Sequence, residues 1–249
     1  MRRLYGIFVL LVVFLLVLGG CSKKDKEGEK ESEEKFKIPD SLLAPIASYN
    51  LTRDEYHLLK GGVMASDDIE LHYPASNVAR FVAVKTFGAA RDAFKLVTEK
   101  IGRPSDGKVV MIGAKDLDDY RFLTRKEWWY YGVIRGDTIY FEPLDIMLKR
   151  SIARIGITQK LAQMALIRRS GGMLPIWLRE AVASFIAGEE EILKAQAKEF
   201  EYKGFNLNVS PDEINQALEE AKDRGATRVA FYGAFRMFKN LLEFSTMED

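Results

Sequence analysis

Cysteine and histidine are scarce in this chain of 249 residues, which contains one cysteine and two histidines. A single cysteine, Cys21, excludes an intramolecular disulfide. The histidines, His57 and His72, are too far apart to share one turn of a helix, so no H-x-x-x-H zinc motif is present. No G-x-S-x-G sequence surrounds a serine. These absences disfavour a hydrolase that uses a serine or cysteine nucleophile with a histidine base.

Excess charge is also lacking, because the formal net charge at pH 7 is +1. A nearly neutral chain gives no electrostatic reason to expect a nucleic-acid partner. The length suits one domain of ordinary size once a leader is removed, and such a domain buries roughly 70% of its unfolded surface. The composition is therefore that of a protein with its own hydrophobic core.

The N-terminus has the pattern of a secretory signal. Arg2 and Arg3 precede an apolar run at residues 7–18, and two glycines lead to Cys21. Residues 18–21 resemble a bacterial lipobox, in which cleavage precedes the cysteine and the cysteine receives lipid. The run is shorter than the roughly 20 residues of a membrane span, although an uncleaved anchor is the alternative. We expect a signal peptide at 1–20 and a lipid-anchored body in the cell envelope, outside the cytoplasm.

Two further segments are expected after the signal peptide at 1–20. Residues 21–38 hold the lipidated Cys21 and a charged stretch too poor in apolar residues to fold, which predicts a disordered tether. Residues 39–249 form the folded domain, with a sheet-containing lobe at 39–143 and a helical lobe at 144–249.

Hydrophobic periodicity predicts a mixture of helices and strands in the domain. Alternation predicts a strand at 69–73, with His72 on the polar face beside Glu70. Gly136 and Asp137 predict a hairpin turn between strands at 130–134 and 139–141. A further strand is expected at 108–113. Helices are expected at 75–101, 116–122, 144–169, 174–187, 189–202, from Ser210 onward, and 228–244.

The central feature is a pair of helical segments, at 157–166 and 174–185. With histidine at positions 159 and 163 and glutamate at 160, the first would read H-E-x-x-H, whose two imidazoles share a helix face and bind zinc. The chain instead has Gln159, Lys160 and Gln163. Glu180, 17 positions after Gln163, stands where a third ligand would come from the next helix.

These two segments, joined by a Gly-containing turn that leads to Pro-x-Trp-Leu-x-Glu, resemble the peptidase MA-like family of gluzincin metallopeptidases. The resemblance covers roughly residues 73–242. It implies an α+β, thermolysin-like zincin fold, with a small N-terminal sheet packed on a long helix and a mainly helical C-terminal lobe. In that arrangement one strand of the sheet lines the substrate cleft and pairs with the peptide backbone.

The chemistry of the motif positions argues against activity. A glutamine amide is a poor zinc ligand beside imidazole or carboxylate. Lys160 is ordinarily a cation at pH 7 and cannot act as a general base on metal-bound water. We therefore expect no metal, no cofactor and no catalytic residue. Lys160 is instead expected to form an ion pair with Glu180 at roughly 4 Å or less, the alternative being a drifted site filled by water.

Two aromatic positions have open interpretations. The cluster at residues 128–131 either packs the sheet against the long helix or forms a rim that grips a ligand, which makes Trp128 and Tyr131 candidate binding residues. Tyr232 lies where the resemblance places a tyrosine near the cleft. It is either a vestige of transition-state stabilisation or an ordinary core phenol.

The leading interpretation is an inactive, membrane-tethered pseudopeptidase that binds a peptide, an envelope protein or a partner enzyme. The alternatives are an active hydrolase with an atypical site and a purely structural envelope lipoprotein.

Overall fold

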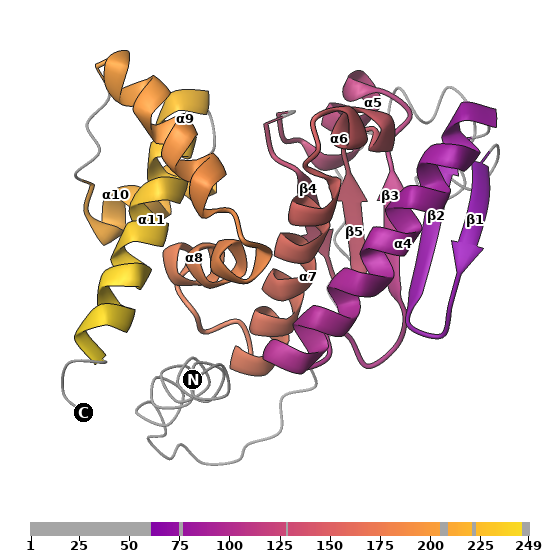
Figure 1. Ribbon diagram of the computed structural model, residues 1–249, viewed down its shortest axis with the longest axis horizontal. Coiled ribbons are helices and arrows are strands. Elements are labelled where there is room, and N and C mark those ends of the chain that lie inside the picture. The colour runs from indigo at the N-terminus through magenta and orange to yellow at the C-terminus, as the bar shows by residue number, and fades with distance from the viewer. Residues whose placement is uncertain (1–60, 75–76, 128, 205–208, 221–222, 246–249) are drawn as a thin grey trace, which may run out of the picture. The chain divides into compact units, whose positions relative to one another are not determined.

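A five-stranded sheet forms one part of the fold in the computed structural model (Figure 1). Its strands lie in the order β1-β2-β3-β5-β4, with β2, β3 and β5 parallel and the edge strands β1 and β4 antiparallel to their neighbours. The strand bounds are β1 Gly61–Ala65, β2 Ile69–Pro74, β3 Val109–Gly113, β4 Gly132–Arg135 and β5 Thr138–Phe141.

The structure describes residues 61–74, 77–127, 129–204, 209–220 and 223–245. The expected signal peptide, Cys21, the tether, His57 and Trp128 lie outside these residues. The described residues belong to a single unit that starts at Gly61. Within them, no helix combines the length and apolar character needed to cross a bilayer.

Helices account for most of the remaining described chain, which confirms a mixed α and β fold with a small sheet. The helix bounds are α4 Asn77–Lys100, α5 Leu117–Thr124, α6 Leu144–Lys149, α7 Ala153–Ser170, α8 Ile176–Ala187, α9 Glu190–Tyr202, α10 Pro211–Glu220 and α11 Arg224–Ser245.

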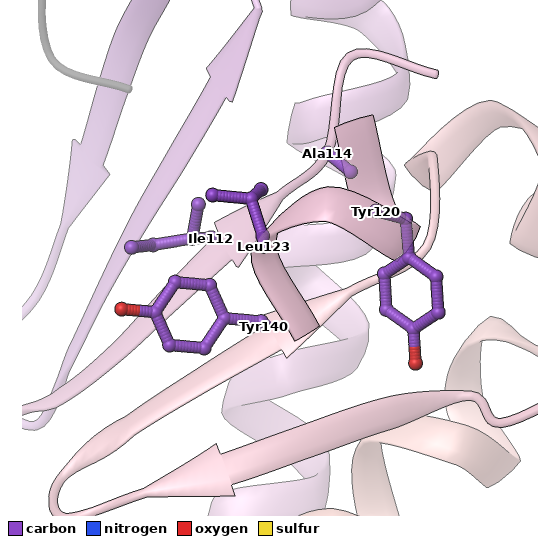
Figure 2. Close-up of a cluster of buried hydrophobic side chains, with 5 residues drawn as sticks. All are labelled: Ile112, Ala114, Tyr120, Leu123 and Tyr140. Carbon is purple, nitrogen blue, oxygen red and sulfur yellow. The ribbon is translucent and has the colours of Figure 1, made fainter. Parts of the chain in front are cut away.

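The two faces of the sheet are covered differently. Alternation along the strands directs fully buried side chains such as Leu71 and Met111 to one face, against which the long helix α4 packs. Helix α5 packs on β5 at the other face. Figure 2 shows the resulting cluster, formed by Ile112, Ala114, Tyr120, Leu123 and Tyr140. Helix α7 contacts α4, α8 and the edge strand β4, and thereby links the sheet to the C-terminal helices.

His72 shares the face of Glu70, as alternation predicts, and its Nε2 lies 2.7 Å from Glu70 Oε1. The ring is nevertheless buried, at 7% exposed. His72 is thus a partnered structural histidine.

The expected single helix at 144–169 is wrong, because the chain forms α6 and α7 instead. Ser151 adopts a positive φ of 58° between them. Its amide bonds to Leu148 O, and the next amide, that of Ile152, bonds to Met147 O. This is the Schellman ending of a helix, with serine in the position that glycine usually takes.

Two helix starts follow capping chemistry. Ser210 Oγ accepts from Glu213 N at 3.3 Å while Ser210 N donates to Glu213 Oε2 at 2.7 Å, so the predicted start near Ser210 is confirmed as a capping box. The last helix begins at Arg224, one turn before the predicted 228. There Asp223 Oδ1 accepts from Ala226 N at 2.7 Å and caps the earlier start.

Candidate functional site

The motif positions lie on the face of α7 that meets α8. Gln159 and Gln163 are one turn apart on α7 and both reach side chains of α8, which are Ser184 and Glu180 respectively. Gln159, Lys160, Gln163 and Glu180 are all 6% exposed or less. The structure therefore brings together the four positions that the sequence pattern singles out, inside the protein and away from solvent.

Gln163 connects the lysine to the carboxylate. Its Oε1 accepts from Lys160 Nζ at 3.2 Å, and its Nε2 donates to Glu180 Oε2. Lys160 and Glu180 form no ion pair within 4.0 Å among the described residues, so the expected direct contact is wrong. The reason is that one carboxamide accepts and donates at once, and Gln163 therefore bridges the two charges.

A second carboxylate, Glu189, completes the cluster. Gln159 Nε2 donates to Glu189 Oε2 at 3.2 Å and to Ser184 Oγ at 3.1 Å. Ser184 and Tyr131 also lie close enough to Glu189 to lower the pKa of its carboxyl group. Sequence reasoning missed Glu189. One feature of the sequence could have pointed to Glu189, which directly follows Gly188, the residue that ends α8. A carboxylate at a helix C-terminus is unfavourable unless other groups stabilise it, so such an acid suggests buried partners.

Arg228 of α11 is the second buried cation of the cluster and was also missed. It is 7% exposed and donates to Trp129 O at 2.7 Å and to Tyr131 Oη at 3.4 Å. Its guanidinium carbon lies 5.3 Å from the centre of the Tyr131 ring, within cation–π range. Arg228 thus joins α11 to the segment before β4, almost one hundred residues earlier in the chain.

Burial disturbs the titration of the charged groups. Burial lowers the pKa of Lys160, while the nearby carboxylates of Glu180 and Glu189 act in the opposite direction. Burial likewise raises the pKa of Glu189, and hydrogen bonds from Ser184 and Tyr131 with the charges of Arg228 and Lys160 oppose that shift. Lys160 and Glu189 therefore each lie near a group of opposite charge, which offsets part of the free-energy cost of burying an ion.

Little open space remains beside these groups. A cavity of about 10 Å³ lies among them, enough for about one water molecule. Its lining comprises Trp129, Tyr130, Tyr131, Gln159, Lys160, Glu189, Arg228 and Phe231. A larger hollow of about 670 Å³ lies between the β1–β2 turn and α4, and none of the motif residues lines it.

The donor set does not fit the zinc ion that the resemblance implies. The amide groups of Gln159 and Gln163 donate to neighbouring oxygens, and the Lys160 ammonium occupies the same space. A cation beside an ammonium and two amide N–H groups would be repelled and poorly ligated. Among the described residues, no group of three or more His, Cys, Asp or Glu side chains could hold a metal ion.

The two aromatic candidates lie differently from the motif residues. Tyr131 is 6% exposed, and a Cβ added to Gly156 of α7 would lie 3.1 Å from Tyr131 Cβ. Gly156 therefore allows α7 to approach the tyrosine closely, and the ring packs inside the domain rather than on a rim. Tyr232 is half-buried on α11 and does not line the small cavity.

Glu142, next to the end of β5, is a buried acid whose effect on stability should depend on pH. Its side chain is fully buried, Oε2 accepts from Arg150 at 3.2 Å, and Oε1 has no hydrogen-bond partner among the described residues. Burial raises the pKa of Glu142 to about 7, although Arg150 and Arg228 oppose the shift. The folded state thus holds this proton more tightly than the unfolded chain, so its stabilisation is complete below about pH 4.5 and declines as pH rises through about 7.

Glu142→Gln should therefore stabilise the fold at pH 8 by about 2–3 kcal/mol and change it little at pH 5, because the amide needs no proton. Urea unfolding at both pH values measures this difference. The control is Glu127→Gln, which removes a partly exposed acid paired with Arg121 and should show no such pH dependence. A Glu142→Gln protein that is less stable at pH 8 would mean that the charge pair with Arg150 outweighs burial.

Comparisons with known proteins find no matching family model, no similar curated protein and no similar solved structure.

Proposed function

We propose that this protein is an inactive relative of the peptidase MA-like metallopeptidases, with a thermolysin-like zincin fold, held at the cell envelope by lipid on Cys21. Its function is to bind an extended segment of a peptide or partner protein. The observation that carries the proposal is the network of Lys160, Gln163 and Glu180, in which side chains that bind one another occupy the general-base position and two of the metal-ligand positions. Such a site has lost catalysis but keeps a peptidase-shaped scaffold.

Two features of the scaffold support the family assignment. Gln159 and Gln163 share the face of α7 that meets α8, where Gln159 contacts Ser184 and Gln163 contacts Glu180, and a zinc-binding pair of helices would need such a shared face. The edge strand β4 also contacts α7, so the edge of the sheet runs beside the helix that carries the motif.

The outer edge of β4, with which no other described strand pairs, offers backbone groups to a ligand. The oxygens of Asp137 and Phe141 accept from Val110 of β3 and from Ala114, the residue after β3. The alternate residues of β5 therefore pair with β4. In the antiparallel register, Ile134 lies opposite Ile139, whose backbone faces β3. The N–H and C=O of Ile134 consequently point away from β5, toward the edge where an added strand would pair.

Ile134→Pro tests this mode of binding, because it removes the outward N–H without removing a β4–β5 hydrogen bond. Decapeptides displayed on phage would be selected on the full chain, then synthesised and titrated against the variants. We expect Ile134→Pro to weaken binding about tenfold, with Ile134→Val as a control that keeps the N–H and the wild-type affinity. Equal affinity for both variants, or no selected peptide at all, would contradict binding at this edge and favour a structural envelope role.

A further inference from the structure

Basic side chains gather at one end of the described unit, where α4 and α7 both finish. The C-terminal ends of these two contacting helices lie side by side in Figure 1. Hydrogen bonds tie the segment after α4 to the last turn of α7, since Arg168 bonds to Asp106 and Arg169 donates to Ile101 O. The exposed cations of this basic end are Lys100, Arg103, Lys108, Arg168 and Arg169.

The acids at this end leave part of the positive charge unbalanced. Asp106 pairs with Arg168, and Asp68 pairs with Arg103 at 2.8 Å. Two further exposed acids, Asp67 and Glu99, also lie here, so the five cations exceed the acids by one charge. Lys100, Lys108 and Arg169 form no ion pair with another described residue. Cations at the C-terminal ends of two helices stabilise those helices through the helix dipoles. This effect does not explain why there are so many of them or why they are exposed.

A large apolar side chain projects from the same end. Met173 is 70% exposed and follows Gly171 and Gly172, whose φ angles of 59° and 79° reverse the chain between α7 and α8. A flexible thioether at the tip of a turn, next to cations, combines the two properties by which proteins associate with anionic lipid. The apolar chain enters the headgroup boundary while the cations meet lipid phosphates.

Another exposed apolar pair lies near the end of α11, where Leu241 is 49% and Phe244 71% exposed. Glu243, also exposed, is adjacent to Phe244 in the sequence. An acid at that position is repelled by an anionic surface, so charge complementarity favours the end that carries Met173.

We propose that the basic end, with Met173 at its tip, docks on the anionic phospholipid surface to which the lipid on Cys21 tethers the chain. This inference rests on the proposed function, because it assumes that the anchor exists. Each cation close to such a surface strengthens association about fivefold. Docking would orient the body on the membrane instead of leaving its orientation to the tether.

A single introduced thiol can test the orientation, because lipid blocks the only native cysteine. Met173→Cys in the full lipidated chain would carry an environment-sensitive fluorophore, and the protein would be placed in nanodiscs with or without anionic phosphatidylglycerol. The matched control is Tyr202→Cys, at a side chain that is 94% exposed on α9, outside the basic end.

We expect the probe at position 173 to shift its emission to the blue only in anionic discs. The shift should disappear in Lys100→Glu/Lys108→Glu and in about 1 M salt, where the screening length is about 3 Å. The control probe should not respond to lipid charge. An anchored protein whose probe at position 173 stays in water, or shifts no more than the control, overturns the docking alone. A chain that does not co-purify with discs, or whose Cys21 reacts with the fluorophore, overturns the anchor and the docking with it.

Discussion

Lys160→Met should lower the free energy of unfolding by about 3–5 kcal/mol, the typical cost of removing one partner from a buried charged network. The substitution keeps most of the volume of a side chain that is 3% exposed. It leaves Gln163 Oε1 without its donor, and Glu180 and Glu189 without their central cation. Urea unfolding of the variant and the wild type measures the loss.

Two controls separate the network from ordinary effects of substitution. Lys149→Met removes an exposed lysine that pairs with Asp145, and it should change stability by less than about 0.5 kcal/mol. Adding Glu180→Gln to Lys160→Met removes an uncompensated negative charge, so the double variant should recover about 2 kcal/mol. A Lys160→Met protein as stable as the wild type, with no recovery in the double variant, would contradict a stabilising network.

Local signals in the sequence predict most of the secondary structure. The hairpin around Gly136, the strand that begins at Ile69 and the capping box at Ser210 each depend on residues within a few positions of one another. The same local reasoning fails at Ser151. It ends α6 in a left-handed conformation that usually requires glycine, and only the hydrogen bonds of the folded chain reveal it.

The same contrast applies to the candidate site, where the local features were predictable from the sequence and the long-range contacts were not. Helical spacing alone predicts that Gln159 and Gln163 share a face, and the resemblance singles out Glu180 as their neighbour. The bridging role of Gln163 was not predictable from spacing, because it depends on where the Lys160 Nζ lies in the folded protein. The role of Arg228 could not be predicted for another reason, because its contacts with Trp129 and Tyr131 join segments that are 99 and 97 residues apart in the sequence.

Introducing an H-E-x-x-H motif at residues 159–163 should create a zinc site. The triple variant Gln159→His, Lys160→Glu, Gln163→His is expected to bind one zinc ion per chain, because residues 159 and 163 lie on the face of α7 that meets α8, where residue 163 already contacts Glu180. Without zinc, the variant should be less stable than the wild type, since the new carboxylate lies near Glu180 and Glu189. Zinc at about 100 times its dissociation constant should then add about 2.7 kcal/mol of stability.

The most direct measurement is a calorimetric zinc titration of the wild type, the triple variant, and the triple variant that also carries Glu180→Gln, each first shown by circular dichroism to be folded. Our account predicts no zinc binding by the wild type, one site in the triple variant, and a much weaker site once Glu180 is replaced. Stoichiometric zinc in the wild type, or a folded triple variant that binds none, would contradict it.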